Sequence, residues 1–223
     1  MSSDTPAHEG HDHHHDHDHH HHGAHAHPTR PDDERPLTYY QRMETALREL
    51  LVEKGILTAD AIRRAVEAMD ARSPAQGARV VARAWSDPAY KARLLADGSA
   101  AVRELGIDVG ATRLIVVENR PGLHNLVVCT LCSCYPRTVL GLPPDWYKSR
   151  AYRSRAVREP RAVLEEFGTE LPSDTEVRVH DSTADMRYLV LPERPQGTEG
   201  WSEERLAAIV GRDAMIGVTR PRV

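Results

Sequence analysis

The sequence predicts an α+β protein, in which an N-terminal helical arm precedes a layered α/β domain. Apolar residues recur at helical spacing as far as Gly106, whereas after Gly110 short runs rich in β-branched residues alternate with helical stretches. The 223 residues are enough for one domain with a core and appended segments. We therefore expect three parts: a tail over residues 1–30, the helical arm over residues 31–110, and the α/β domain over residues 111–223.

The arm is expected to consist of successive amphipathic helices. The first has apolar residues at helical spacing from Leu37 onwards and ends at Gly55. Thr58 is suited to cap the second helix. Further along, Asp87 and Pro88 supply a cap and a first-turn proline that separate a third helix from a fourth. Because an arm of this kind leaves an apolar face uncovered, we expect another polypeptide to pack on it.

The second half of the chain is expected to contain strands and helices in alternation. Short apolar runs predict strands over residues 114–117, 126–128, 175–179 and 186–191. The first two strands are separated by a turn signal, Pro121-Gly122. Helices are expected over residues 145–167, with a break at Pro160, and over residues 202–210.

The tail is a low-complexity segment rich in histidine and aspartate. Twelve of the fourteen histidines lie between His8 and His27, interleaved with Asp12, Asp16 and Asp18. So polar a segment cannot bury a core, and we expect it to be disordered. Unlike an expression tag, its histidines are interrupted by aspartates. Imidazole and carboxylate groups together bind Co²⁺, Ni²⁺ or Zn²⁺, so the tail is interpreted as a metal reservoir or delivery arm.

Composition excludes several classes of protein. The net charge of −4 arises in the tail, since residues 1–29 hold five acids and no Lys or Arg, which leaves 28 acids against 29 bases in the body. Neither nucleic acid nor a membrane surface is therefore expected as a partner. We see no apolar run long enough to cross a bilayer and no signal peptide, and the few cysteines fit a reducing cytoplasm.

All three cysteines lie in one segment, Cys129-Thr130-Leu131-Cys132-Ser133-Cys134. An odd number at this spacing excludes a disulfide framework, because the bridges would be too short. Thiolates are soft donors, and a CxxC segment can surround one ion if a loop turns both sulfurs inward. The third thiolate directs the backbone nitrogens of Ser133 and Cys134 towards the same ion. Three sulfurs and two amide nitrogens would give a five-coordinate site with a sixth position open for water or substrate.

Three other interpretations of the cysteines fit the sequence less well. A structural zinc site requires four closed ligands, so a fourth would have to come from His124, His180 or the tail. A redox CxxC pair usually opens a helix, and Pro136 follows too soon for that. Three idle buried cysteines within six positions would be a coincidence. The spacing therefore favours a catalytic metal site.

Further runs of residues surround the cysteines and point to one family. They are Val127-Val128, Tyr135-Pro136, Val139-Leu140-Gly141-Leu142-Pro143-Pro144, Trp146-Tyr147-Lys148, Tyr152-Arg153-Ser154-Arg155, Arg158-Glu159-Pro160-Arg161, Arg187-Tyr188, Leu191-Pro192-Glu193-Arg194-Pro195, Gly197-Thr198-Glu199-Gly200-Trp201-Ser202 and Ile216-Gly217-Val218. From about residue 37 to residue 218 the chain resembles the α subunit of nitrile hydratase, a family that includes the metal-bearing γ subunit of thiocyanate hydrolase. Thr130 and Tyr135 match the cobalt branch of this family, since the iron branch has Ser and Thr there.

The resemblance implies the metal and its ligands. One Co³⁺ per chain, rather than iron, would be held by Cys129, Cys132, Ser133 and Cys134. Cys132 would be oxidised to a sulfinate and Cys134 to a sulfenate, while Cys129 stays a thiolate. The ion would act as a Lewis acid that polarises a nitrile or activates water. The sulfenate oxygen of Cys134 is then the expected nucleophile or base.

The resemblance also implies partners and supporting residues. Arg187 matches an arginine that supports the cysteine loop, and Asp181 and Asp185 match acidic positions that face histidines of a β subunit. A β-type subunit, as one chain or split into two, would supply two arginines and form a hetero-oligomer with this chain. A metallochaperone or activator is a further expected partner.

Arg137 is the main departure from the nitrile hydratase pattern. Nitrile hydratases commonly place Trp at this position, at the substrate pocket, whereas thiocyanate hydrolase has Arg. A guanidinium beside the metal would favour an anion such as thiocyanate. The following loop, Gly141 to Trp146, is instead the nitrile hydratase version. We therefore expect hydration of a nitrile to its amide, with hydrolysis of thiocyanate to carbonyl sulfide and ammonia as the alternative, and a non-catalytic cobalt carrier as a third.

Overall fold

The computed structural model describes residues 36–223, so the tail expected over residues 1–30 lies outside the described residues. The chain divides into two compact units, the first ending at Leu51 and the second spanning Val52–Val223. Helix α1 (Tyr39–Glu53) makes up most of the described part of the first unit, and none of its residues is buried. Its apolar side chains are therefore available to a partner.

The second unit opens with α2 (Ala59–Asp70), which starts at the cap that the sequence predicts. The side chain of Thr58 accepts a hydrogen bond from the backbone N–H of Ala61, and Asp60 adds a negative charge to the first turn. No residue of α2 is buried. The helices α1 and α2 are thus the parts of the expected arm whose apolar faces remain exposed.

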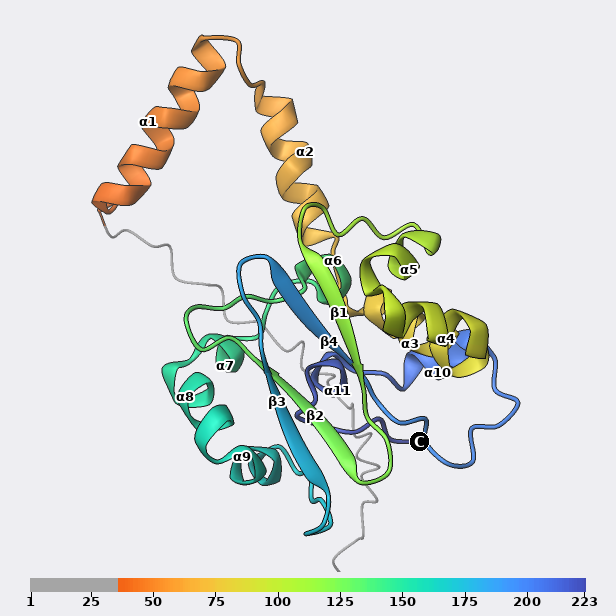
Figure 1. The fold of residues 1–223 in the computed structure, drawn as a ribbon. Coiled ribbons are helices and arrows are strands. Elements are labelled where there is room, and N and C mark those ends of the chain that lie inside the picture. Colours follow the sequence, from red (N-terminus) through yellow and green to blue (C-terminus); the bar gives the residue numbers. More distant parts are fainter. Residues whose placement is uncertain (1–35) are drawn as a thin grey trace, which may run out of the picture. The chain divides into compact units, whose positions relative to one another are not determined.

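The next three helices pack into the second unit. They are α3 (Pro74–Ser86), α4 (Pro88–Ala96) and α5 (Gly98–Glu104). Asp87 caps α4 as expected, because its side chain accepts the N–H groups of Ala89 and Tyr90. Asp97 caps α5 in the same way. Both α4 and α5 contact strand β1, and Figure 1 shows them beside it.

The strands form two parallel pairs. Strand β1 (Arg113–Glu118) pairs with β4 (Met186–Leu191), and β2 (Leu123–Val128) pairs with β3 (Glu176–Asp181). The turn at Pro121-Gly122 joins β1 to β2, as predicted, but the ladders connect segments far apart in the chain. The register places Leu114 opposite Arg187 and Val128 opposite Asp181.

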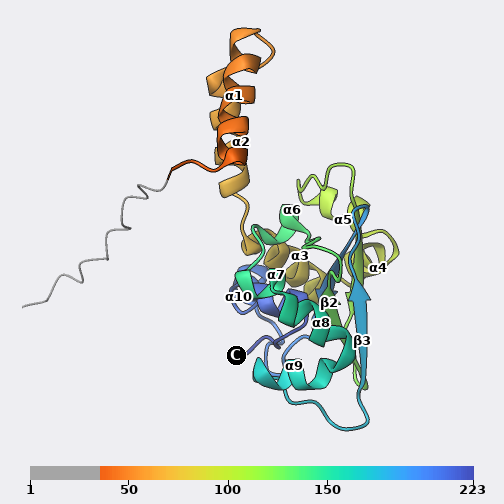
Figure 2. The ribbon, with the colours of Figure 1, turned by 90° about the vertical axis from the view of Figure 1, so that its left-hand side faces the viewer.

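The remaining helices cover the strands. They are α6 (Arg137–Leu140), α7 (Asp145–Lys148), α8 (Arg150–Arg158), α9 (Pro160–Glu166), α10 (Glu203–Ala208) and α11 (Arg212–Ile216). The helical stretch expected over residues 145–167 is present and breaks at Pro160, with a second break at Ser149. The short helices α6 and α11 are not predicted by the sequence analysis. In Figure 2, α8 and α9 lie beside β2 and β3; α8 contacts β2, and α9 contacts β3. The prediction of an α+β fold is confirmed.

Strand β2 is buried along its whole length, although it contains two polar residues. His124 pairs through Nε2 with the carbonyl oxygen of Gly217 at 2.7 Å, and through Nδ1 with the Asn119 amide at 3.3 Å. The side chain of Asn119 also accepts the backbone N–H of Asn125 at 2.7 Å. These hydrogen bonds remove the cost of burying the polar groups, and they fix the strand that leads to the cysteines.

Within residues 36–223, no helix has the length and apolarity needed to span a membrane.

The tight approach of Gly217 to β2 yields a prediction about stability. Gly217 has φ of +92°, and a Cβ built there would lie 2.1 Å from the carbonyl oxygen of Asn125. We expect Gly217→Ala to lower the free energy of unfolding by about 3 kcal/mol or more, since it adds a backbone clash to the strain of a left-handed residue. The measurement is a urea denaturation curve.

The matched control is Gly197→Ala. Gly197 also has a left-handed φ, of +77°, but nothing lies within 4 Å of a Cβ there. It should lose only about 1 kcal/mol, the cost of strain alone. Equal losses at both positions would show that β2 and Gly217 are not packed as the structure has them.

Candidate metal centre

The cysteine loop starts directly after the last residue of β2. Cys129 follows Val128 and is buried, with 1 % of its surface exposed, while Cys132 is exposed and Cys134 is partly buried. The prediction that the cysteines lie on a loop after a strand is confirmed. The parallel ladder therefore sets the position of the first sulfur, and the loop brings the other two back to it.

The three sulfurs converge on one point. The Sγ atoms of Cys129 and Cys132 are 3.5 Å apart, and those of Cys132 and Cys134 are 3.3 Å apart. All three lie within 4.8 Å of one another, and the backbone N–H of Cys132 donates to the Cys129 sulfur at 3.3 Å. Such a cluster of soft donors fits a thiophilic transition-metal ion.

Neighbouring tyrosines hold the two ends of the loop. The hydroxyl of Tyr152 donates to the carbonyl oxygen of Val127 at 2.6 Å, just before the loop. The hydroxyl of Tyr147 donates to the carbonyl oxygen of Cys134 at 2.9 Å, at the end of the loop. The Tyr135 ring packs edge-on against Tyr147, with 5.2 Å between centroids. Helices α7 and α8 thus brace the cysteines from one side.

The surroundings of the thiols shift their pKa values in opposite directions. Hydrogen bonds from Cys134 and Cys129 lower the pKa of the exposed Cys132 thiol to about 7. Burial, supported by the hydrogen bond to Cys132, raises the pKa of the Cys134 thiol to about 12, and the charge of Arg187 opposes this shift. Of these two thiols, Cys132 is therefore the one that ionises more readily.

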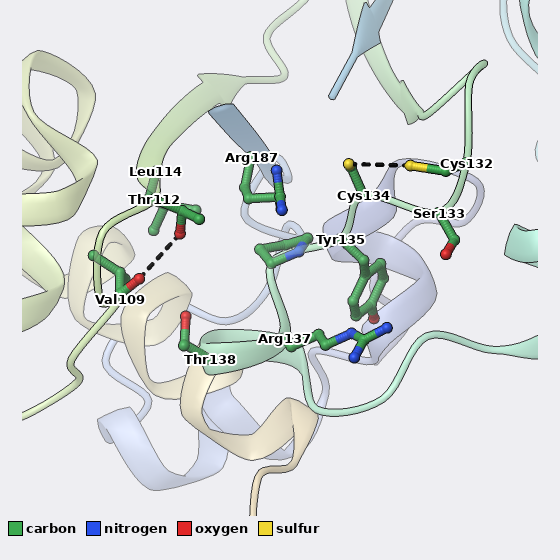
Figure 3. Close-up of a pocket in the computed structure, with 11 residues that line it drawn as sticks. Val109, Thr112, Leu114, Cys132, Ser133, Cys134, Tyr135, Arg137, Thr138 and Arg187 are labelled. Carbon is green, nitrogen blue, oxygen red and sulfur yellow. Dashed lines mark hydrogen bonds between the residues drawn. The ribbon is translucent and has the colours of Figure 1, made fainter. Parts of the chain in front are cut away.

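A cavity of about 380 Å³ opens beside the loop (Figure 3). The walls are formed by Val109, Thr112, Leu114, Cys132, Ser133, Cys134, Tyr135, Pro136, Arg137, Thr138 and Arg187. In Figure 3 the Arg187 side chain lies between Leu114 and Cys134, whereas the Arg137 side chain extends towards the Tyr135 ring. Arg187 belongs to β4 and is half-buried, while Arg137 is exposed at the first position of α6.

The structure thus brings together the four expected metal-binding residues and the two arginines singled out from the sequence. Cys132, Ser133 and Cys134 line one cavity with Arg137 and Arg187, and Cys129 lies beneath them. The histidines weighed as zinc ligands are engaged elsewhere: His124 pairs with Gly217, and His180 pairs with the Asn125 side chain at 2.8 Å. Among the described residues, the only potential metal-binding group is formed by the three cysteines.

Two features of the site were missed from the sequence. Val109 and Thr112 form a cavity wall, although they precede β1 and carry no recognisable motif. Asp181, expected to face a partner subunit, accepts hydrogen bonds from Thr130 inside the cysteine loop. The sequence predicts a strand over residues 175–179, close to this aspartate. It does not predict the parallel pairing with β2 that brings Asp181 to Thr130.

The chain has two parallel strand pairs, a loop with three converging thiols and a cavity beside that loop. These features are typical of a protein that binds a metal ion through thiolates. Comparison with known proteins identifies the family. Residues 38–219 match the family described as nitrile hydratase, alpha chain, and the chain belongs to this family.

Individual relatives support the assignment. The cobalt-containing nitrile hydratase subunit alpha of Pseudonocardia thermophila is 54 % identical over 176 residues, which cover 78 % of this chain and 86 % of the relative. The thiocyanate hydrolase subunit gamma of Thiobacillus thioparus is 44 % identical over 195 residues, which cover 82 % of this chain and 80 % of the relative. Among solved structures, a double mutant of the Fe-type nitrile hydratase from Comamonas testosteroni Ni1 matches with a TM-score of 0.75 and 45 % identity. The match covers 82 % of this chain and 90 % of the solved chain.

The bracing role of Tyr147 can be tested by Tyr147→Phe. This change removes the hydrogen bond to the carbonyl oxygen of Cys134 at the end of the loop, so the free energy of unfolding should fall by about 1 kcal/mol. Tyr188→Phe, on β4, is the control and should have no measurable effect, because no hydrogen bond of its hydroxyl is found among the described residues. Denaturation of the two variants side by side checks this, and equal stability would contradict the role of Tyr147.

Proposed function

We propose that this chain is the metal-bearing subunit of a cobalt nitrile hydratase, which hydrates a nitrile to the corresponding amide. The observation that carries the proposal is the convergence of three cysteine sulfurs at the wall of a cavity that also contains Arg187. It is supported by the 54 % identity to a cobalt-containing nitrile hydratase subunit.

The donor set fits a cobalt ion. The sulfurs of Cys129, Cys132 and Cys134 and the backbone nitrogens of Ser133 and Cys134 would hold one Co³⁺ per chain. Strong sulfur and amide donors stabilise the trivalent ion. The resemblance of Thr130 and Tyr135 to the cobalt branch of the family favours cobalt over iron, although an Fe-type enzyme is among the similar structures. When bound, the ion supplies a Lewis acid at the mouth of the cavity.

The exposure of the thiols matches the oxidation that we propose. Cys132 is exposed and Cys134 partly exposed, so oxidants can reach both, whereas the buried Cys129 would remain a thiolate. We assign a sulfinate to Cys132 and a sulfenate to Cys134. The sulfenate oxygen of Cys134 would face the cavity and take a proton from the attacking water, or attack the nitrile carbon itself.

Arg187 would act as a positioning residue for this group. Its guanidinium lies on the Cys134 side of the cavity and favours the charged form of Cys134. The negative oxygens formed on oxidation require such counter-charges, because an unpaired charge in a partly buried site is costly. Arginines of a partner subunit would complete the neutralisation.

The exposed helices are proposed to bind that partner, a β-type subunit in one chain or two. Large apolar side chains remain exposed on and around α1 and α2. Those at least half exposed are Leu37, Tyr39, Tyr40, Met43, Leu47 and Ile56. Exposed apolar side chains in this number are unfavourable in water and are typical of segments that a partner covers. We place the resulting hetero-oligomer in the cytoplasm.

Thiocyanate hydrolysis is the second candidate, and Arg137 is the observation that favours it. Its side chain lines the same cavity as Cys134 and is exposed. A guanidinium at this point would attract an anionic substrate. A thiocyanate hydrolase subunit is also among the relatives, at 44 % identity.

The oxidation state of the cysteines is directly measurable. In chain purified with its partner from cells supplied with cobalt, the peptide from Cys129 to Cys134 should carry two oxygens on Cys132 and one on Cys134. Metal analysis should give one cobalt per chain. Cys134→Ser should abolish activity even where metal is retained, since serine forms no sulfenate. Active protein with three unmodified thiols would contradict the proposal, and a cobalt-loaded, unmodified chain without turnover would indicate a carrier.

Arg137→Trp separates the two enzymatic functions. For an uncharged nitrile, the substitution should preserve turnover and change only the size preference. For thiocyanate, it removes a charge-assisted contact worth roughly 1.5–3 kcal/mol, which corresponds to a loss of about ten- to a hundredfold in kcat/KM. The measurement is kcat/KM for both substrates, with partner subunits present. If the wild-type enzyme turns over thiocyanate but no nitrile, thiocyanate hydrolysis would replace nitrile hydration as the proposed function.

A further inference from the structure

The loop between the first two cysteines is held by a side chain from the neighbouring strand. Asp181, the last residue of β3, accepts the backbone N–H of Thr130 through Oδ1 at 2.9 Å and the Thr130 hydroxyl through Oδ2 at 2.5 Å. Arg153 of α8 adds a longer contact, 3.4 Å, to the carbonyl oxygen of Thr130. Both polar backbone atoms and the hydroxyl of one loop residue are therefore engaged by residues outside the loop.

The position of this contact makes it an extension of the β2–β3 ladder. Val128 is paired with Asp181, and its carbonyl oxygen accepts the backbone N–H of Ser182 at 2.7 Å. The backbone ladder ends there, and the Asp181 side chain carries the connection two residues further, past Cys129 to Thr130. The loop thus leaves the sheet in a fixed direction.

The direction of the loop matters because the three sulfurs must already lie close together before a metal ion binds. Sulfurs 3.3–3.5 Å apart repel one another once they are ionised, and a free loop would gain entropy by spreading them. We propose that Asp181 and Thr130 form a clamp that pre-organises the cysteines for metal capture, with both residues acting as positioning residues. This inference rests on the proposed cobalt site.

The clamp should control the rate of metal uptake more than global stability. Thr130 and Asp181 are both exposed, so their hydrogen bonds contribute little to folding. These hydrogen bonds instead order the cysteine loop. A loop that is already ordered does not lose conformational entropy when the metal binds. The expected consequence is slower cobalt uptake when the clamp is removed, in a chain that remains folded.

The test uses the full-length chain, purified without metal under reducing conditions and mixed with Co²⁺. Uptake is followed by the sulfur-to-cobalt charge-transfer absorption, which cobalt bound to the histidines of the tail does not produce. Thr130→Val, which keeps the shape but loses the hydroxyl, should take up cobalt about tenfold more slowly. Asp181→Asn should be slowed about three- to tenfold, because an amide is a weaker acceptor than a carboxylate. Thr130→Ser, which retains the hydroxyl, should load within about twofold of the wild-type rate.

Matched controls separate the clamp from general effects. Thr219→Val and Asp174→Asn make the same chemical changes at other places in the chain, Thr219 after α11 and Asp174 before β3. Both variants should take up cobalt at the wild-type rate. The thiols of metal-free Thr130→Val should also react faster with a thiol reagent, while its urea denaturation matches that of Thr219→Val. Should Thr130→Val fail to fold, the comparison of Asp181→Asn with Thr130→Ser carries the test.

Uptake at the wild-type rate by both Thr130→Val and Asp181→Asn would overturn the clamp. Equal slowing of Thr130→Ser and Thr130→Val would do so too, because the hydroxyl would then be irrelevant. A wild-type chain that captures no cobalt through its cysteines would overturn the proposed function itself, and the inference with it.

Discussion

The parallel ladder between β2 and β3 ends at Val128 and Asp181, and the metal-binding loop begins at the next residue of β2. This ladder is the constraint on which the site depends. Because β2 is buried from end to end, its register cannot slip without exposing apolar residues and unpairing His124 and Asn125. The first sulfur is thus fixed by the core of the protein, and the two others need only a short loop to reach it.

The second strand pair supplies the opposite wall of the cavity. Pairing of β1 with β4 sets Leu114 beside Arg187, so that an apolar side chain and a guanidinium both line the space next to Cys134. The cavity therefore has a charged side towards the sulfurs and an apolar side away from them. The nitrile proposed as substrate has a polar, electron-rich end and a carbon chain, which would suit this division.

Much of this arrangement follows from the sequence, and the rest depends on contacts that sequence patterns do not encode. The strands, the caps at Thr58 and Asp87 and the three converging cysteines are local features, and local rules predicted them. The parallel pairing joins segments about fifty residues apart, so no local signal showed that Asp181 would meet Thr130. Helices α6 and α11 are too short to produce a periodic pattern. The cavity wall at Val109 likewise depends on tertiary packing.

We propose that one cobalt ion is held by the three cysteines and not by the histidines of the tail. X-ray absorption at the cobalt edge of the purified, active complex distinguishes these two locations. We expect sulfur scatterers from Cys129, Cys132 and Cys134 together with light-atom scatterers from the backbone, and the same spectrum after removal of residues 1–27. A first shell of nitrogen and oxygen alone, or a spectrum that loses its main features with the tail, would contradict it.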